Sequence, residues 1–217
     1  AGQQAVAYGW RQHEHLPAKA TALARDLQAN PAGGIGFRAE IMGRSAAVKL
    51  QVPGRHNVLN ALAALTVASL LGLDLEAAGK TLDQFQGAGR RFEVRGEAGG
   101  VTVIDDYAHH PTEIRATLAA ARSRYPGRRI WAVWQPHTYS RTRTLFDEFA
   151  TAFTDAEAVI VTEVFKSREA AQDFSAEQVV KAMNHSGARF IAGLPQVTEY
   201  LQSHLTPGDV LLVLSAG

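Results

Sequence analysis

Apolar and polar residues alternate with a period of two along residues 34–52, and this period indicates two β-strands. The alternating apolar positions are Ile35, Phe37, Ala39 and Ile41 in the first strand and Val48, Leu50 and Val52 in the second. The segment MGRS between the strands can form the turn that joins them. The preceding segment, TALARDLQAN, fits a helix or a strand, so the pattern alone leaves its structure open.

A helical pattern replaces the alternation after Pro53 and Gly54, which break the strand pattern. Asn57 is the predicted N-cap of the first helix. The apolar face of this helix comprises Val58, Leu59, Leu62, Leu65 and Leu71. A second helix is predicted over residues 75–85, and its buried face comprises Leu75, Ala78, Leu82 and Phe85.

Short apolar strands alternate with helical stretches from residue 101 onward. The predicted strands are VTVID, RIWAVWQ, AVIVTEV, ARFIA and VLLVL, and the predicted helices start near Pro111, Ser140, Ser175 and Leu194. This alternation predicts an α/β fold with a mostly parallel sheet and helices on both of its faces. Three polar clusters, DDYAHHPTEI, QPHTYSRTR and EVFKSRE, directly follow strands. They are therefore expected to converge at the carboxyl edge of the sheet, where such folds bind ligands.

The composition is that of a globular protein. The 217 residues are 46% apolar and 20% charged, which allows one or two domains with a sizeable core. The net charge of +1, without a long basic run, argues against nucleic acid or a membrane surface as a partner. The chain has no cysteine, which excludes disulfides and thiol catalysis and is compatible with the cytosol. No apolar stretch is long enough to span a bilayer.

Two motifs in the first half of the chain invite functional interpretations. Residues 79–81, GKT, resemble the end of a phosphate-binding loop, but Asp74 stands where that motif needs glycine, so a helix is predicted instead. Asn57 and Asn60 lie one helical turn apart, and an amide side chain can pair with the edge of adenine. The alternative is that Asn57 only caps the helix and Asn60 lies on its surface.

The segment DDYAHHPTEI, residues 105–114, concentrates candidate chemistry. Adjacent histidines at 109 and 110 point apart, so a dedicated metal site is not expected, although HEH at residues 13–15 could contribute ligands. Either aspartate could accept hydrogen bonds from a ribose. Pro111 and Glu113 are explained by helix initiation. The pairs Arg90–Arg91 and Arg141–Arg143 suit phosphate or carboxylate, or are simply solvated.

Four motifs of this sequence, GRHNVLNALAAL, GRRFE, DDYAHHPTEI and QPHTYSRTR, resemble motifs that occur in this order and at this spacing in the Mur ligase family. The resemblance runs over essentially the whole chain. It implies that residues 1–92 are the last part of a central P-loop ATPase domain and that residues 93–217 form a Rossmann-like ligase domain. Both ends of the sequence look cut. The UDP-sugar domain, the phosphate-binding loop and most magnesium ligands are therefore expected outside these residues, and the chain alone is expected to be inactive.

The reaction that the resemblance implies is cytoplasmic, ATP-dependent amide formation in peptidoglycan synthesis, with Mg²⁺ as the metal. The carboxylate of UDP-N-acetylmuramate becomes an acyl phosphate, which the amine of L-alanine attacks. One alternative is the family member that attaches a whole tripeptide to the same sugar acid during recycling. It shares HHPT, but QPHTYSRTR favours the alanine-adding reaction. A second alternative is a nucleotide-binding module without ligase chemistry.

The resemblance also assigns roles in nucleotide binding, position by position. It places His56, Asn57 and Asn60 near the adenine. It directs Arg91 toward the phosphates of ATP and Asp106 toward the ribose.

A second set of residues is assigned to the substrates and the reacting centre. Tyr107 and His109 face the incoming alanine, and together with Arg91 they are the catalytic candidates. His137 and Arg141 join them from the next strand end, with Arg141 as the candidate for the carboxylate of alanine.

Two departures from the family pattern affect this assignment. Thr138 stands where many members carry arginine, so Arg141 is expected to bear more of the anion binding. The segment EVFKSREAAQDFS departs from the commoner tyrosine–proline version. Arg168 and Glu169 within it match a family stretch, but their role stays open.

Overall fold

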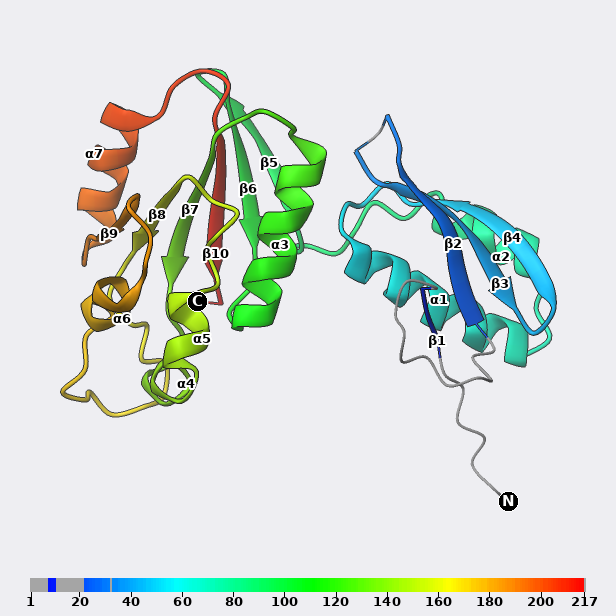
Figure 1. Cartoon of the computed structure of the whole chain (residues 1–217), viewed down its shortest axis with the longest axis horizontal. Coiled ribbons are helices and arrows are strands. Elements are labelled where there is room, and N and C mark those ends of the chain that lie inside the picture. The colour runs from blue at the N-terminus through cyan, green and yellow to red at the C-terminus, as the bar shows by residue number, and fades with distance from the viewer. Residues whose placement is uncertain (1–7, 11–21, 32, 217) are drawn as a thin grey trace. The chain divides into compact units, whose positions relative to one another are not determined.

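The computed structural model describes residues 8–10, 22–31 and 33–216 (Figure 1). The chain divides into two compact units, Ala1–Gly87 and Ala88–Gly217, here called the N-terminal and the C-terminal unit. The sequence places the boundary at residue 92, whereas residues 88–92 fold with the C-terminal unit. No helix in the described part of the chain is long and apolar enough to cross a membrane.

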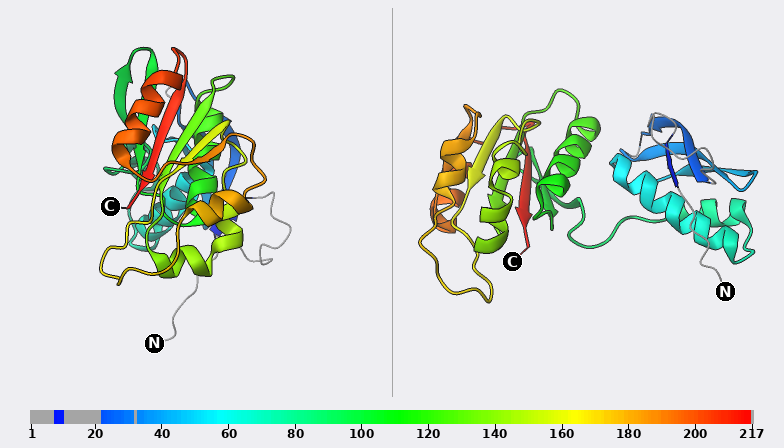
Figure 2. Two further views of the ribbon diagram at one scale, coloured as in Figure 1. Left: turned by 90° about the vertical axis from the view of Figure 1, so that its left-hand side faces the viewer. Right: turned by 60° about the horizontal axis from the view of Figure 1, so that its bottom comes forward.

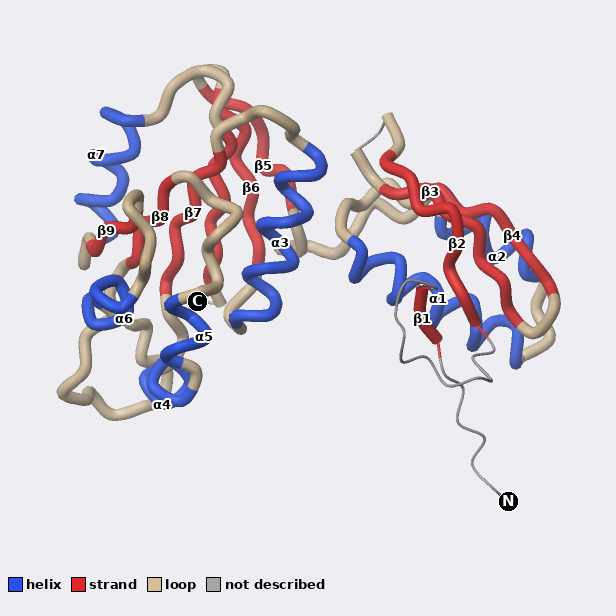
Figure 3. The backbone as a smooth tube through the Cα atoms, in the orientation of Figure 1, coloured by secondary structure: helices blue, strands red, loops and turns tan. Residues whose placement is uncertain are grey.

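In its described residues, the N-terminal unit is a four-stranded sheet covered by two helices (Figure 3). Its strands are β1 (Tyr8–Trp10), β2 (Ala22–Ala29), β3 (Ile35–Ile41) and β4 (Arg44–Lys49), in the order β1-β2-β3-β4. The first strand predicted by the alternation is confirmed. The second is confirmed only in part, because β4 ends at Lys49, and Leu50 and Val52 are buried beyond its end. The open segment before them forms a strand. β2, β3 and β4 are antiparallel, and β1 runs parallel to β2.

The two helices of this unit are α1 (Arg55–Leu70) and α2 (Leu75–Leu82), and they bury their apolar faces on the sheet. Val58, Leu62 and Leu65 of α1 are buried as predicted. The prediction for Leu71 is wrong, because α1 ends at residue 70 and this side chain is 72% exposed. Phe85 is also exposed, since α2 ends three residues before it.

The predicted N-cap of α1 is wrong as well. Gly54 is the N-cap, and its φ of 93° is a conformation that glycine adopts without the steric cost of a side chain. Asn57 lies in the first turn, where its amide Nδ2 donates to the carbonyl oxygen of Pro53 at 2.7 Å. The helix therefore starts three residues earlier than predicted, because a backbone turn, not a side chain, sets its first residue.

The GKT segment lies inside α2, as predicted. The carboxylate of Asp74 caps this helix by accepting the amide N–H of Ala77 at 2.7 Å. Gly79 is buried against β4, where an added Cβ would lie 3.2 Å from the carbonyl oxygen of Ala47. The glycine thus serves close packing of helix on sheet.

The C-terminal unit is built on a six-stranded, mostly parallel sheet of the order β5-β6-β10-β7-β8-β9. Its strands are β5 (Glu93–Ala98), β6 (Val101–Asp106), β7 (Ile130–Gln135), β8 (Ala158–Val161), β9 (Ala188–Phe190) and β10 (Val210–Ser215). β5 is antiparallel to β6, whereas all the other pairs are parallel. The sequence pattern did not predict β5, because its residues are mostly exposed and show no apolar period.

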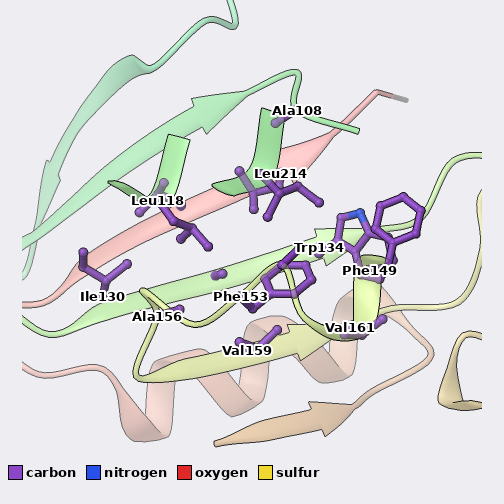
Figure 4. Packing of buried hydrophobic residues seen from close by; sticks show 14 of the residues in the cluster. Ala108, Leu118, Ile130, Trp134, Phe149, Phe153, Ala156, Val159, Val161 and Leu214 are labelled. Carbon is purple, nitrogen blue, oxygen red and sulfur yellow. The ribbon is translucent and has the colours of Figure 1, made fainter. Parts of the chain in front are cut away.

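Helices cover both faces of this sheet, as the alternation predicts (Figure 2). They are α3 (Pro111–Arg124), α4 (Tyr139–Thr144), α5 (Phe146–Ala150), α6 (Glu177–Ala182) and α7 (Leu194–His204). α3, α5 and α6 contribute to the larger core, and α7 packs on the opposite face through Val197. Figure 4 shows Trp134 in the larger core beside Phe149 and Phe153, with ring centroids 4.5 and 5.4 Å away.

Candidate functional site

The loops after β6, β7 and β8 converge at the carboxyl edge of the sheet, as their sequence positions predict. The rings of His109 and His137 meet edge to face with centroids 6.4 Å apart. Phe165, which follows β8, stacks on His137 with centroids 5.7 Å apart and planes inclined by 18°. Its amide N–H donates to the carbonyl oxygen of Pro136 at 2.8 Å. Side chains from three strand ends thus form one surface.

Asp106 fixes the backbone on which this surface begins. The residue is 5% exposed, and its two oxygens accept the amide N–H groups of Phe92 and Ala108 at 2.8 and 2.7 Å. Burial raises the pKa of Asp106 above its usual value, although these hydrogen bonds act in the opposite direction. A contact of Asp106 with a ribose stays a prediction, and it requires one of these oxygens to accept a second hydrogen bond.

The segment held by Asp106 has a strained backbone. Arg90 and Phe92 have φ angles of 56° and 51°, in the left-handed region that residues with a side chain rarely occupy. Such residues cost on the order of 1–3 kcal/mol each and persist only where surrounding contacts fix them. Here the ring of Phe92 is buried in the larger core, and the carbonyl oxygen of Arg90 accepts the N–H of Tyr107 at 2.8 Å.

The two neighbouring arginines have different environments. The guanidinium of Arg90 binds Asp105 at 3.2 Å and the carbonyl oxygen of Ser215 at 2.7 Å. The side chain of Arg91 is 51% exposed and lies over the ring of Tyr107, with Cζ 5.4 Å from the centroid. Arg90 is therefore structural, whereas Arg91 is half-exposed and has Glu113 as an ion-pair partner at 3.8 Å, so a phosphate could still reach its guanidinium.

The start of α3 confirms the interpretation of Pro111 and Glu113 as helix initiation. His110 is the N-cap, and its Nδ1 accepts the N–H of Thr112 at 3.2 Å. The carboxylate of Glu113 accepts the N–H groups of His109 and His110 at 3.0 and 3.2 Å, which completes a capping box. The sequence predicts the acid at this position but not that a histidine is the cap.

The hydrogen bond of His109 defines its tautomer. Nδ1 lies 2.9 Å from the carbonyl oxygen of Tyr107, which can only accept. Nδ1 therefore carries the proton, and Nε2 of the neutral ring is an acceptor. A ring fixed in this way can take up a proton from a reacting group.

His137 has the opposite tautomer. Its Nδ1 lies 3.4 Å from Nη1 of Arg141, and the same guanidinium nitrogen donates to the backbone oxygen of His137 at 2.6 Å. Burial lowers the pKa of His137, and the positive charge of Arg141 lowers it further. The ring is thus neutral at pH 7, and Nε2 carries the proton because Nδ1 faces a donor. The edge therefore presents an imidazole acceptor and an imidazole donor side by side.

Glu169 joins the loops that follow β7 and β8. Its carboxylate accepts hydrogen bonds from the hydroxyl of Thr138 at 2.6 Å, from the amide of Ser140 at 3.1 Å, and from the hydroxyl of Ser140. The hydrogen bonds from Ser140 and Thr138 lower the pKa of Glu169 to about 2. Arg168, which the sequence pairs with it, is exposed.

The predicted adenine residues lie on the first turns of α1 in the N-terminal unit. His56 and Asn60 are exposed, and Asn57 is half-buried. The side-chain nitrogen of Asn60 donates to Oδ1 of Asn57 at 3.3 Å. The pair is linked as one polar patch, and its contact with a nucleotide stays a prediction.

The described residues also bear on the predictions about a metal site. Within residues 8–10, 22–31 and 33–216, no three His, Cys, Asp or Glu side chains are arranged to hold a metal ion. The HEH segment at 13–15 lies outside the described residues.

Sequence reasoning missed Glu163, whose carboxylate accepts hydrogen bonds from the amides of Val164 and Ala176 and from the hydroxyl of Ser175, at 2.8–3.1 Å. An acid two residues after a buried strand was the available signal.

Residues 90–217 match the model of the family described as Mur ligase, glutamate ligase domain. The fold, the converging strand ends and this match define the class, and the chain belongs to the Mur ligase family.

Particular relatives are similar over most of the chain. The chain is 50% identical over 173 residues to a UDP-N-acetylmuramate–L-alanine ligase of Chloroflexus aggregans, covering 78% of this chain and 36% of the relative. It is 48% identical over 183 residues to the enzyme of that name from Gloeobacter violaceus, covering 83% and 39%. The crystal structure of UDP-N-acetylmuramate-alanine ligase from Thermotoga maritima is 32% identical with a TM-score of 0.76, covering 93% of this chain and 44% of that chain. The chain thus spans about two fifths of the length of these relatives.

Proposed function

We propose that this chain is part of an ATP-dependent ligase that joins L-alanine to UDP-N-acetylmuramate through an acyl phosphate, with Mg²⁺ as the metal. The relatives described above bear the name of this reaction, which favours alanine over a tripeptide as the amine substrate. The N-terminal unit would belong to the ATPase domain and the C-terminal unit to the ligase domain. The observation that carries the proposal is the surface formed by His109, His137 and Arg141 at one sheet edge.

The reaction needs groups that this surface supplies. Arg141 has five N–H donors, of which the backbone oxygen and Nδ1 of His137 face the two on Nη1, so the remaining three suit the carboxylate of an amino acid. Nε2 of His109 can accept the proton that the attacking amine loses. Nε2–H of His137 can donate to an oxygen on which negative charge develops. Tyr107 supports Arg91 and, through its backbone oxygen, the tautomer of His109.

Nucleotide binding is assigned separately in each unit. Arg91 has an exposed guanidinium fixed over an aromatic ring, which fits a phosphate of ATP. In the N-terminal unit, the exposed Asn60 and His56 with Asn57 fit the polar edge of a purine. When bound, ATP supplies the phosphoryl group that activates the sugar carboxylate.

The test uses the full-length protein with ATP, Mg²⁺ and UDP-N-acetylmuramate. Phosphate release is measured with L-alanine, glycine, L-serine or the recycled tripeptide as the only amine. We expect release to depend on the sugar acid and to have its highest kcat/KM with L-alanine. A higher value with the tripeptide would assign the recycling reaction instead. ATP binding without amine-dependent turnover would reject the ligase function altogether.

A further inference from the structure

The loop after β8 holds the start of α4 in place through hydrogen bonds to which no role has been assigned above. This set of hydrogen bonds is here called the brace. The carboxylate of Glu169 is the centre of this brace, since it accepts three hydrogen bonds from Thr138 and Ser140. The two acceptor oxygens thus bind two residues that flank the first residue of α4. Glu169 is thereby joined to Thr138 and Ser140, which precede it in the sequence by 31 and 29 positions.

The residues held by Glu169 determine where His137 and Arg141 lie. The carbonyl oxygen of Thr138 accepts the amide N–H of Thr142 at 2.9 Å and its hydroxyl at 2.7 Å. Arg141 stands between these positions, and its guanidinium returns to the backbone oxygen of His137 at 2.6 Å. A shift of Thr138 would therefore move the guanidinium and the imidazole together.

The helix cannot hold this arrangement by itself. α4 has six residues, its N-cap Thr138 makes no side-chain capping hydrogen bond, and so short a helix is marginal without outside contacts. Phe165 holds the same loop from the other side by stacking on His137. Glu169 provides the polar half of the contact between the two loops.

We infer that Glu169 is a positioning residue, which acts through Thr138 and Ser140 to orient Arg141 and His137 toward the carboxylate of the amino acid. This inference rests on the proposed function for the identity of the substrate. Glu169 itself does not touch the amino acid in this account. Its loss should therefore weaken amino-acid binding while leaving nucleotide binding nearly unchanged.

The first test separates positioning from direct contact in the full-length protein. We expect Glu169→Ala to raise the KM for L-alanine about ten-fold and the KM for ATP by less than about two-fold. The double variant Thr138→Val/Ser140→Ala, which removes the hydroxyl donors but keeps the carboxylate, should have a similar effect. Combining all three changes should add little, because coupled residues are not additive. Additive effects would mean that Glu169 contacts the substrate itself and would overturn the inference.

Conservative and matched variants complete this test. Glu169→Gln keeps one acceptor oxygen and can donate to a hydroxyl, so it should restore most of the affinity for alanine. Glu177→Ala is the control, since this glutamate forms a surface ion pair with the exposed Lys181 at 2.9 Å and lies away from the start of α4 in the sequence. It should leave both KM values unchanged. Equal effects of the changes at 169 and 177 would contradict the inference.

A second measurement does not depend on activity. Amide hydrogen exchange over residues 139–144 should be faster in Glu169→Ala than in the wild type, and unchanged in Glu177→Ala. Unchanged exchange in Glu169→Ala would show that the carboxylate does not hold α4 and would overturn the inference. If exchange accelerates but the wild-type protein does not use L-alanine, the proposed function fails while the brace stands.

Discussion

Asp106 provides a prediction whose magnitude follows from its contacts. The change Asp106→Ala leaves the amides of Phe92 and Ala108 buried without their acceptors. An unsatisfied buried donor costs about 1–3 kcal/mol, so the two together cost about 2–6 kcal/mol. Removing a carboxylate whose pKa is raised by burial offsets part of this cost. We therefore expect the C-terminal unit to lose about 2–4 kcal/mol of unfolding free energy at pH 7.

Urea denaturation followed by tryptophan fluorescence measures this loss. The sequence has three tryptophans, and Trp131 and Trp134 lie in β7 of the C-terminal unit. A Trp10→Phe background removes the signal of the N-terminal unit, so the fluorescence reports the stability of the C-terminal unit alone.

Asp105→Ala is the matched control. Asp105 is the adjacent aspartate, and its partly exposed carboxylate binds Arg90 at 3.2 Å. Ion pairs of this kind contribute about 0–1 kcal/mol, so this control should lose much less stability. A smaller loss for Asp106→Ala than for Asp105→Ala would refute the reasoning, because burial of the charge would then outweigh both hydrogen bonds.

Three further predictions concern separate regions. Glu169 has its pKa lowered from 4.5 to about 2, so its stabilising contribution is present above pH 4.5 and is lost as the pH falls through about 2. The difference in thermal midpoint between wild type and Glu169→Gln should therefore shrink as the pH falls from 4.5 to about 2. A constant difference would contradict the claim that these hydrogen bonds stabilise the ionised carboxylate of Glu169. Gly34→Ala should destabilise the N-terminal unit by more than about 2 kcal/mol, because the new Cβ would lie 1.9 Å from the carbonyl oxygen of Leu50. Gly43→Ala, with open space around its Cβ, should cost only about 1 kcal/mol for its φ of 79°, and equal losses in circular-dichroism melts would reject the clash. Arg91→Ala in the full-length enzyme should raise the KM for ATP about ten-fold or more and leave that for alanine nearly unchanged, and an unchanged ATP value in steady-state kinetics would remove Arg91 from phosphate binding.

Apolar periodicity predicts the elements of this fold wherever one face of an element is buried. It identifies β3 and β4 and the parallel strands of the C-terminal unit, since their buried residues alternate or form short apolar runs. It misses β5, an antiparallel edge strand whose side chains are mostly exposed. It also overextends both helices of the N-terminal unit, because Leu71 and Phe85 are apolar but lie beyond the last helical turn.

In the candidate site, too, the sequence predicts what depends on local pattern but not which distant residues become hydrogen-bond partners. Strand ends can be located in the sequence, so the convergence of His109 with His137 could be predicted. The partners of Asp106 and Glu169 could not, because they come from backbone amides and hydroxyls far away in the sequence. Tautomers are likewise set by carbonyl oxygens and neighbouring charges that no motif records.

The KM for L-alanine in the Arg141→Ala variant of the full-length enzyme tests the central claim most directly. A charge-assisted hydrogen bond to a carboxylate contributes about 1.5–3 kcal/mol, which corresponds to roughly a ten- to hundred-fold change in affinity. Arg143→Ala is the matched control on the same helix, since that arginine is exposed and its guanidinium donates to the side-chain oxygen of Gln172 at 3.3 Å. The account predicts a rise of that size in the alanine KM for Arg141→Ala, a nearly constant KM for ATP, and no change for Arg143→Ala. An unchanged alanine KM in Arg141→Ala would contradict the assignment of this sheet edge to the amino acid.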